Sequence, residues 1–209
     1  MESFLLIAHY VMLRKGVVWR MLSAKNKAIP GYISTEAQRF YERVIPISQT
    51  TDFSDSEAVS QFRKAVHSEW AAVTADIEFP FYFQEIMLDG VRAVRISTDT
   101  TRETDRVILL AHGGAYVLGT PEVNASSAIL LAQATGIPVI SVDYRLAPEH
   151  PFPAALNDVT DSFLSLLESG YAPDQIVMVG ESAGAGLAVS SCLLLRDKDL
   201  PLPGGLVLL

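Results

Sequence analysis

An apolar run that leads directly into a glycine-flanked serine limits most strongly how this chain can fold. Ile176–Val179 is apolar at every position, which is typical of a strand covered on both faces in a parallel sheet. Gly180-Glu181-Ser182-Ala183-Gly184 follows at once, and Ala185–Arg196 then has the pattern of a helix. A turn this sharp strains the serine backbone, and the flanking glycines avoid clashes with the neighbouring strand or helix. We therefore predict an exposed Ser182 hydroxyl above the edge of a sheet.

Strand and helix patterns alternate along the chain from about residue 76. Phe79–Met87 and Val91–Ser97 flank Asp89-Gly90, a strong signal for an antiparallel hairpin. The other predicted strands are Val107–Ala111, Pro138–Val142 and Gly205–Leu209. One further predicted helix begins at Thr120-Pro121 and ends at Gly136, and another begins near Leu156 and ends at Gly170. Such alternation predicts an α/β fold with a mainly parallel, twisted sheet and flanking helices.

The first 75 residues have helical rather than strand patterns. Ser54 and Glu57 form a capping-box pattern, and an apolar stripe follows at helical spacing, which we interpret as core packing: Val59, Phe62, Val66, Trp70 and Val73. The pattern of residues 4–22 predicts an amphipathic helix. This helix packs either on the protein's own apolar surface or at a membrane interface, where it would make a peripheral lipid contact. We divide the chain into a helical N-terminal region, 1–75, and an α/β region, 76–209.

A second glycine motif, His112-Gly113-Gly114-Ala115, follows directly after the predicted strand Val107–Ala111. Paired glycines let backbone N–H groups approach a developing oxyanion closely, so we expect Gly113, Gly114 and Ala183 to donate to it. Loss of one such donor costs about 3 kcal/mol of transition-state stabilisation. A plain glycine turn is the alternative, but both motifs stand at the carboxyl ends of strands, where open α/β sheets bind ligands.

Three motifs together resemble the hormone-sensitive-lipase family of esterases over residues 76–209. They are His112-Gly113-Gly114-Ala115-Tyr116, Asp143–Ala155, and Gly180-Glu181-Ser182-Ala183-Gly184. The resemblance implies an α/β-hydrolase fold with an N-terminal helical cap, a small-molecule ester substrate of short to medium acyl chain, and no cofactor. It makes Ser182 the nucleophile, with His112, Gly180, Glu181 and Gly184 as supporting motif residues. The family usually has a third glycine where Ala115 stands.

The segment Asp143–Ala155 is expected to support the site rather than react. Pro148, Pro151 and Pro153 stiffen a loop that leads into a helix. Asp143 and Arg145 carry opposite charges, so we expect them to pair and hold the loop.

The chain shows no base for the serine at the place where the family carries it. In this fold the acid and then the histidine follow the nucleophile, yet only Asp197 and Asp199 follow Ser182, and all four histidines precede it: His9, His67, His112 and His150. His67 is expected at the surface or in the cap, and His150 is the one internal substitute. We therefore expect an incomplete chain that lacks C-terminal strands, with the triad acid and base elsewhere, for example on a second polypeptide.

Two functional hypotheses follow from this pattern. The first is a serine ester hydrolase working through an acyl-Ser182 intermediate, in which these 209 residues alone are inactive. The second is a non-catalytic ligand-binding protein on the same fold, because no histidine follows Ser182. Fluorophosphonate labelling of Ser182 separates the two.

Composition and charge exclude several other classes of protein. The formal charge of −8 and the lack of any basic run argue against nucleic acid as a partner. No His, Cys and carboxylate cluster has the spacing of metal ligands, and no glycine turn is followed by the Lys-Ser or Lys-Thr of a phosphate-binding loop. Cys192 is the single cysteine and lies in an apolar run, so we interpret it as a buried structural thiol. A reducing, cytoplasmic location fits this cysteine count.

Overall fold

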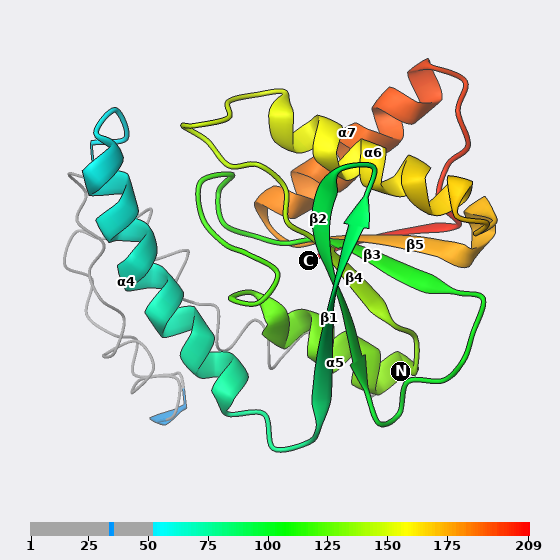
Figure 1. Cartoon of the computed structure of the whole chain (residues 1–209), viewed down its shortest axis with the longest axis horizontal. Coiled ribbons are helices and arrows are strands. Elements are labelled where there is room, and N and C mark those ends of the chain that lie inside the picture. The colour runs from blue at the N-terminus through cyan, green and yellow to red at the C-terminus, as the bar shows by residue number, and fades with distance from the viewer. Residues whose placement is uncertain (1–33, 36–51) are drawn as a thin grey trace. The chain divides into compact units, whose positions relative to one another are not determined.

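The computed structural model describes residues 34–35 and 52–209 of the chain (Figure 1). The predicted helix at 4–22 and most of the predicted cap lie outside these residues. The chain divides into two compact units, Met1–Phe62 and Arg63–Leu209. In the first unit the rings of Phe53 and Phe62 meet edge to face, with centroids 5.9 Å apart. The division predicted at residue 75 stays a prediction.

The first described helix, α4, spans Ser56–Ala75 and begins two residues after the predicted cap. The capping-box prediction for Ser54 is wrong. Asp55 caps the helix instead, because its Oδ1 accepts the N–H groups of Glu57 at 2.9 Å and of Ala58 at 3.4 Å. The Ser54 hydroxyl donates to Asp52 and is therefore committed outside the helix. α4 ends at Ala75, and strand β1 begins at Phe81.

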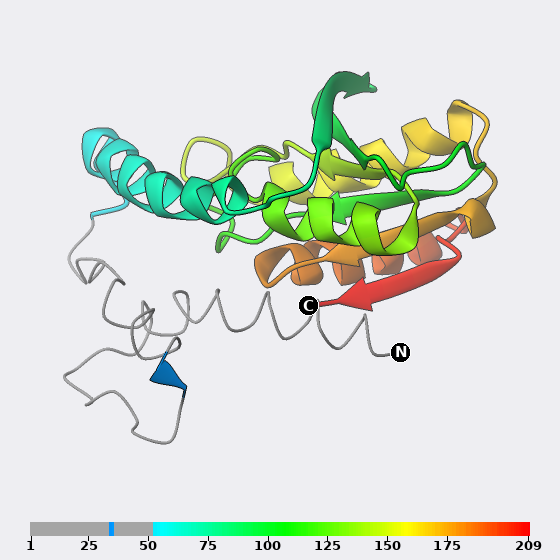
Figure 2. The ribbon, with the colours of Figure 1, turned by 90° about the horizontal axis from the view of Figure 1, so that it is seen from below.

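A six-stranded sheet forms the centre of the second unit. Its strands are β1 (Phe81–Leu88), β2 (Val91–Thr98), β3 (Val107–Ala111), β4 (Val139–Val142), β5 (Ile176–Gly180) and β6 (Gly205–Leu208). They lie in the order β1-β2-β4-β3-β5-β6. The first two strands are antiparallel to their neighbours, and β4, β3, β5 and β6 are parallel. Figure 2 shows the hairpin of β1 and β2 at the opposite end of the sheet from β6.

The hairpin prediction is confirmed, with a two-residue connection between β1 and β2. Asp89 and Gly90 both adopt positive φ, 46° and 80°. Positive φ at both central residues matches the right-handed twist of the two strands, and glycine adopts it without a steric penalty.

Helices cover both faces of the sheet (Figure 1). They are α5 (Ala125–Thr135) on one face, and α6 (Ala154–Glu168) and α7 (Ala183–Asp197) on the other, with a 3-10 turn at Pro173–Gln175. Each face has its own apolar core. Phe163 of α6 and Ile129 of α5 are both fully buried, one in each core. Strand β3, buried at every position, contributes side chains to both, as expected of a central parallel strand.

The position predicted for the start of α5 is wrong. Thr120 and Pro121 begin a turn, in which the Thr120 hydroxyl accepts the Val123 N–H at 3.2 Å. The helix itself begins at Ala125 after Asn124. The helix stop at Gly136 is confirmed, because this residue has a φ of 69° and its N–H donates to the Ala132 carbonyl.

The sheet register brings the two glycine motifs side by side. Ala111 at the end of β3 pairs with Gly180 at the end of β5. His112 and Glu181 therefore leave the sheet at the same edge, and the Glu181 N–H donates to the Ala111 carbonyl at 3.1 Å. In the described part of the chain no helix is long and apolar enough to cross a membrane.

Candidate active site

Ser182 lies at the turn between β5 and α7 and has a strained backbone. Its φ of 51° and ψ of −114° lie in a region that L-residues rarely adopt, and its side chain is exposed. A Cβ on Gly180 would meet Ala185 of α7, and a Cβ on Gly184 would meet the backbone of Ala111. The turn therefore requires glycine at both positions, as the sequence predicted, and the serine is held out above the sheet edge.

The loop Gly113–Gly119 lies beside this turn and is named the glycine loop below. A Cβ on Gly113 would be 3.5 Å from the Cβ of Ser182 and 3.2 Å from the Glu181 carbonyl oxygen, so its backbone lies against the serine. Four loop residues have positive φ: Gly114, Ala115, Tyr116 and Gly119. Ala115 has a φ of 53°, in the left-handed region that favours glycine. It stands at the position where the resembled family usually has its third glycine.

Three backbone N–H groups around Ser182 are uncommitted within the described residues. The amides of Gly113, Gly114 and Ala183 donate to no acceptor there, whereas the Ser182 N–H donates to the Leu209 carbonyl at 2.9 Å. Ala183 is the first residue of α7, where the partial positive charge of the helix N-terminus favours an anion.

His112 is fully buried beneath the glycine loop. Its Nδ1 is 2.8 Å from the Gly113 carbonyl, and its ring stacks on Tyr144 with centroids 4.2 Å apart. The Tyr144 hydroxyl donates to the His112 carbonyl at 2.7 Å, and burial raises the pKa of Tyr144 far above its usual range, so this donor stays protonated. These contacts place His112 as a support of the loop.

The Glu181 side chain is also buried, on the other side of the same loop. Its Oε2 accepts the Ser127 hydroxyl of α5 at 3.1 Å. A Cβ on Gly113 would lie 3.4 Å from Oε1, so the carboxylate packs directly under the glycine. Glu181 thus joins β5, α5 and the glycine loop.

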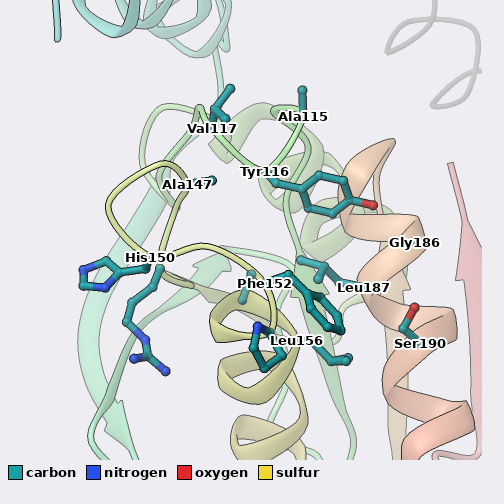
Figure 3. Close-up of a pocket in the computed structure, with 13 residues that line it drawn as sticks. Ala115, Tyr116, Val117, Ala147, His150, Phe152, Leu156, Gly186, Leu187 and Ser190 are labelled. Atoms are coloured by element: carbon teal, nitrogen blue, oxygen red, sulfur yellow. The ribbon is translucent and has the colours of Figure 1, made fainter. Parts of the chain in front are cut away.

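None of the described histidines is hydrogen-bonded to the Ser182 hydroxyl. The Nε2 of His67 accepts the Gly119 N–H at 3.0 Å, and burial, followed by the charge of Arg63, lowers the pKa of its imidazole. His67 was expected at the surface or in the cap; it lies half-buried on α4, within the region predicted as the cap, and its contact with Gly119 was not predicted. His150 is exposed, and Figure 3 shows its ring directed away from Tyr116.

An apolar cavity of about 480 Å³ lies between the glycine loop, the residues around the start of α6, and α7 (Figure 3). Tyr116 and Val117 of the glycine loop, Phe152 before α6, and Gly186 and Leu187 of α7 line it. A Cβ on Gly186 would be 2.6 Å from the Tyr116 hydroxyl oxygen, so this glycine lets the ring lie against the helix. Gly186 is about one helical turn beyond Ser182, and Ser182 itself does not line the cavity.

Asp143 and Arg145 do not pair with each other, so that prediction is wrong. Arg145 forms a fork with the buried carboxylate of Asp158 in α6, at 2.7 to 3.1 Å. Asp143 accepts from Nη1 of Arg92 at 2.9 Å, while its own N–H donates to the Arg92 carbonyl. Burial raises the pKa of Asp143, while the ion pair with Arg92 of β2 acts in the opposite direction. The two residues follow β4 but bind to different elements.

Several supporting contacts were not found by the sequence patterns. Ser127, Tyr144 and Arg63 all contact the site from other elements. The four-residue spacing of Arg63 and His67 was a usable signal, since such residues share one face of a helix. Ser127 had no such signal, whereas Tyr144 lies within the segment Asp143–Ala155 that was expected to support the site. The described residues contain no group of three or more His, Cys, Asp and Glu side chains arranged to hold a metal ion.

Comparison with known proteins relates this chain to α/β hydrolases. Residues 108–209 match the model of a family with the alpha/beta hydrolase fold. An acetyl-hydrolase of Streptomyces hygroscopicus is 42% identical over 106 residues, and an esterase of Acinetobacter venetianus is 38% identical over 124 residues. A crystal structure of an esterase from the bacterial hormone-sensitive lipase family matches 97% of this chain with a TM-score of 0.68 and 25% identity. The matched part of the chain is similar to α/β hydrolases, among them an esterase of the bacterial hormone-sensitive lipase family.

This α/β hydrolase spans about half or less of the length of those relatives. The matches cover 51% of the chain and 36% of the acetyl-hydrolase, and 59% of the chain and 40% of the Acinetobacter esterase. The match to the crystal structure covers 56% of the esterase chain in that structure. The predicted fold class is confirmed, since the strand-turn-helix at Ser182 and the glycine loop lie within the matched residues.

Proposed function

We propose that this α/β hydrolase contributes the nucleophile and the oxyanion hole of a serine ester hydrolase. The observation that carries the proposal is the strained, exposed Ser182 at the N-terminus of α7, beside uncommitted amides. Attack by the Ser182 oxygen on an ester carbonyl carbon would create an oxyanion. Gly113, Gly114 and Ala183 are the donors that we assign to it.

The proton of the Ser182 hydroxyl needs an acceptor during attack. We propose that a histidine outside the described residues takes it, in this polypeptide or a second one, and passes it to the leaving alkoxide. The carbonyl–alkoxide bond then breaks and leaves an acyl-Ser182 ester. Water attacks this ester in the second half of the reaction, giving its proton to the same imidazole, and releases the carboxylic acid.

For the substrate we propose esters of short to medium acyl chains. The lining of the cavity between the glycine loop and α7 is mainly apolar, and its volume of about 480 Å³ is that of a small-ligand site. The relatives named acetyl-hydrolase and esterase support this substrate class by analogy. A series of p-nitrophenyl esters from acetate to laurate tests it, with rates expected to fall toward the longest chain. Preference for laurate over butyrate would contradict it.

The nucleophile is tested by labelling the natively expressed polypeptide with a fluorophosphonate and mapping the adduct by mass spectrometry. We expect the adduct on Ser182 and none in Ser182→Ala. The exposed Ser56, the first residue of α4, provides a matched control. Ser56→Ala should label at the rate of the unaltered chain. Labelling of another serine while Ser182 stays free would overturn the proposal.

A second candidate function is ligand binding without catalysis. It is favoured by one observation, that no imidazole among the described residues is hydrogen-bonded to Ser182. This function predicts that a non-hydrolysable ester analogue binds and protects the polypeptide against thermal unfolding, while neither labelling nor ester turnover occurs. Turnover that Ser182→Ala abolishes would exclude it.

A further inference from the structure

The glycine loop cannot maintain its conformation through its own hydrogen bonds. Ala115 and Tyr116 are consecutive non-glycine residues with φ of 53° and 64°, a left-handed conformation that L-residues adopt only at a cost in free energy. Inside the loop, the N–H groups of Val117 and Leu118 donate to the Gly114 carbonyl at 3.0 and 2.8 Å. These two bonds close a turn but do not fix the loop against its surroundings. Strain of this kind persists only where other elements hold the backbone.

Arg63 of α4 holds the loop from outside through one guanidinium group. Its Nε donates to the Val117 carbonyl at 2.8 Å, and its Nη2 donates to the Ala147 carbonyl at 2.8 Å. Nη1 and Nη2 also donate to the two carboxylate oxygens of Glu149, at 2.8 and 2.7 Å. This hydrogen-bonded pairing lowers the pKa of Glu149 to about 2. Five donors in a rigid plane can satisfy these four acceptor atoms at once, whereas a lysine has only three donors on a single nitrogen.

Two further contacts complete the junction around Arg63. His67 lies one helical turn along α4 and accepts the Gly119 N–H, so α4 holds the loop at both Val117 and Gly119. The Ala147 N–H donates to the Tyr116 carbonyl at 2.9 Å. The glycine loop, the segment 145–149 and α4 therefore meet at Arg63. The Arg63 side chain is 20% exposed, so its hydrogen bonds are only partly open to competition from water.

We propose that Arg63 is a positioning residue for the glycine loop, which sets the direction of the Gly113 and Gly114 N–H groups. The effect that we expect on catalysis rests on the proposed function, whereas the effect on the conformation of the loop does not. The physical reason is that Val117 is held three residues after Gly114, inside the turn that the Gly114 carbonyl closes. Release of Val117 would free the strained residues between them to relax toward ordinary φ.

The structural part is tested by hydrogen exchange on the 209-residue chain. Arg63→Met keeps the aliphatic stem and removes every donor. We expect amides of the glycine loop and of 145–149 to exchange at least about tenfold faster, while the melting temperature falls by about 2–4 °C, the equivalent of one lost interaction. Arg63→Lys should recover part of the protection. Arg106→Met is the matched control, because Arg106 is exposed and has no side-chain partner among the described residues.

Two results of the exchange experiment would overturn the proposal. Unchanged exchange across the glycine loop in Arg63→Met would show that other contacts suffice. Faster exchange spread evenly over β3, β5 and the loop, with a large fall in melting temperature, would show that Arg63 only stabilises the fold.

The catalytic part is tested by the rate of fluorophosphonate labelling at Ser182 and by p-nitrophenyl acetate kinetics. We expect Arg63→Met to lower the labelling rate and kcat about tenfold with KM changed less than about twofold, since the donors act on the transition state. Full reactivity together with fast loop exchange would overturn the positioning role. Because the proposed base lies outside the described residues, both measurements use the natively expressed polypeptide. If that polypeptide does not react at all, the proposed function fails, and the exchange comparison still decides whether Arg63 positions the loop.

Discussion

The backbone of Ser182 shows how a single residue combines strain with function. Its φ of 51° and ψ of −114° suit glycine, yet a serine stands there with its side chain exposed. Positions at which strain is retained are often sites of chemistry, because relief of the strain would remove the reacting group. The stability of the fold and the presence of the hydroxyl therefore oppose each other at this residue.

Ser182→Gly is expected to stabilise the chain while it removes the hydroxyl that we propose as the nucleophile. Glycine adopts the same φ and ψ without strain, so the free energy of unfolding should rise by about 1 kcal/mol. Urea unfolding followed by circular dichroism measures this change. Ser190→Gly is the matched control on the same helix, where glycine should instead lower stability by about 1 kcal/mol. A loss of stability in both variants would contradict the assignment of strain to Ser182.

Gly184 illustrates a different constraint, that of space. A Cβ there would meet the backbone of Ala111 and the carbonyl of His112, which cannot move without shifting β3. We expect Gly184→Ala to lower the free energy of unfolding by about 3 kcal/mol, as overpacking does. Gly205→Ala is the control, because its Cβ would be 3.6 Å from the Val177 side chain, an ordinary contact. Equal effects in the two variants would sink the explanation.

At the scale of elements, much of the architecture could be predicted from local pattern. Strand β3 was predicted with its exact bounds, and the Asp89-Gly90 hairpin and the β5–Ser182–α7 turn were predicted in kind. In each case neighbouring residues determine the conformation, through burial on both faces or a turn that requires glycine. The roles assigned to Gly113, Gly114, Ala183 and Ser182 stay predictions.

Two of the wrong predictions, the Ser54 capping box and the start of α5, concern local turns, and the wrong ion pair concerns contacts between elements distant in sequence. Asp143 and Arg145 are two residues apart, yet Asp143 pairs with Arg92 of β2 and Arg145 pairs with Asp158 of α6. The start of α5 depends on the turn after Thr120, which lies next to the glycine loop. A local pattern has no information on which of several acceptors or donors is nearest in space. For the same reason the contact of His67 with Gly119 could not be foreseen.

The contact between α4 and the glycine loop should depend on pH through His67. Its Nε2 accepts the Gly119 N–H, so the imidazole must be neutral at that atom, and burial lowers its pKa below the ordinary value of 6.5. An unfolded chain takes up the proton at a higher pH than the folded chain does. The contribution of the contact is therefore complete above pH 6.5 and is lost as pH falls through the lowered folded pKa.

Melting temperatures measured between pH 7.5 and 5 test this dependence. We expect His67→Gln to flatten the fall in melting temperature toward acid, because glutamine keeps an acceptor and does not titrate. His150→Gln is the control, since His150 is exposed and should leave the pH profile as it is. Identical profiles for the unaltered chain and His67→Gln would contradict the assignment.

At the scale of the second compact unit, one sheet separates two apolar cores. Phe163 of α6 packs in the core on one face, and Ile129 of α5 packs in the core on the other. Strand β3 is buried throughout and belongs to both cores. Disruption of either core therefore exposes a strand that the other core requires, so both should unfold in a single cooperative transition.

Phe163→Ala and Ile129→Ala test this cooperativity. Both side chains are fully buried, so the free energy of unfolding should fall by about 4 and about 3 kcal/mol, from lost burial and from the cavity left behind. Urea unfolding curves should shift as a whole, with one transition and an unchanged slope. Leu193→Ala, an exposed residue of α7, should change the free energy by about 0.5 kcal/mol or less. A separate early transition in one variant, with the remainder unfolding at the original midpoint, would show that the two faces are independent and that β3 does not couple them.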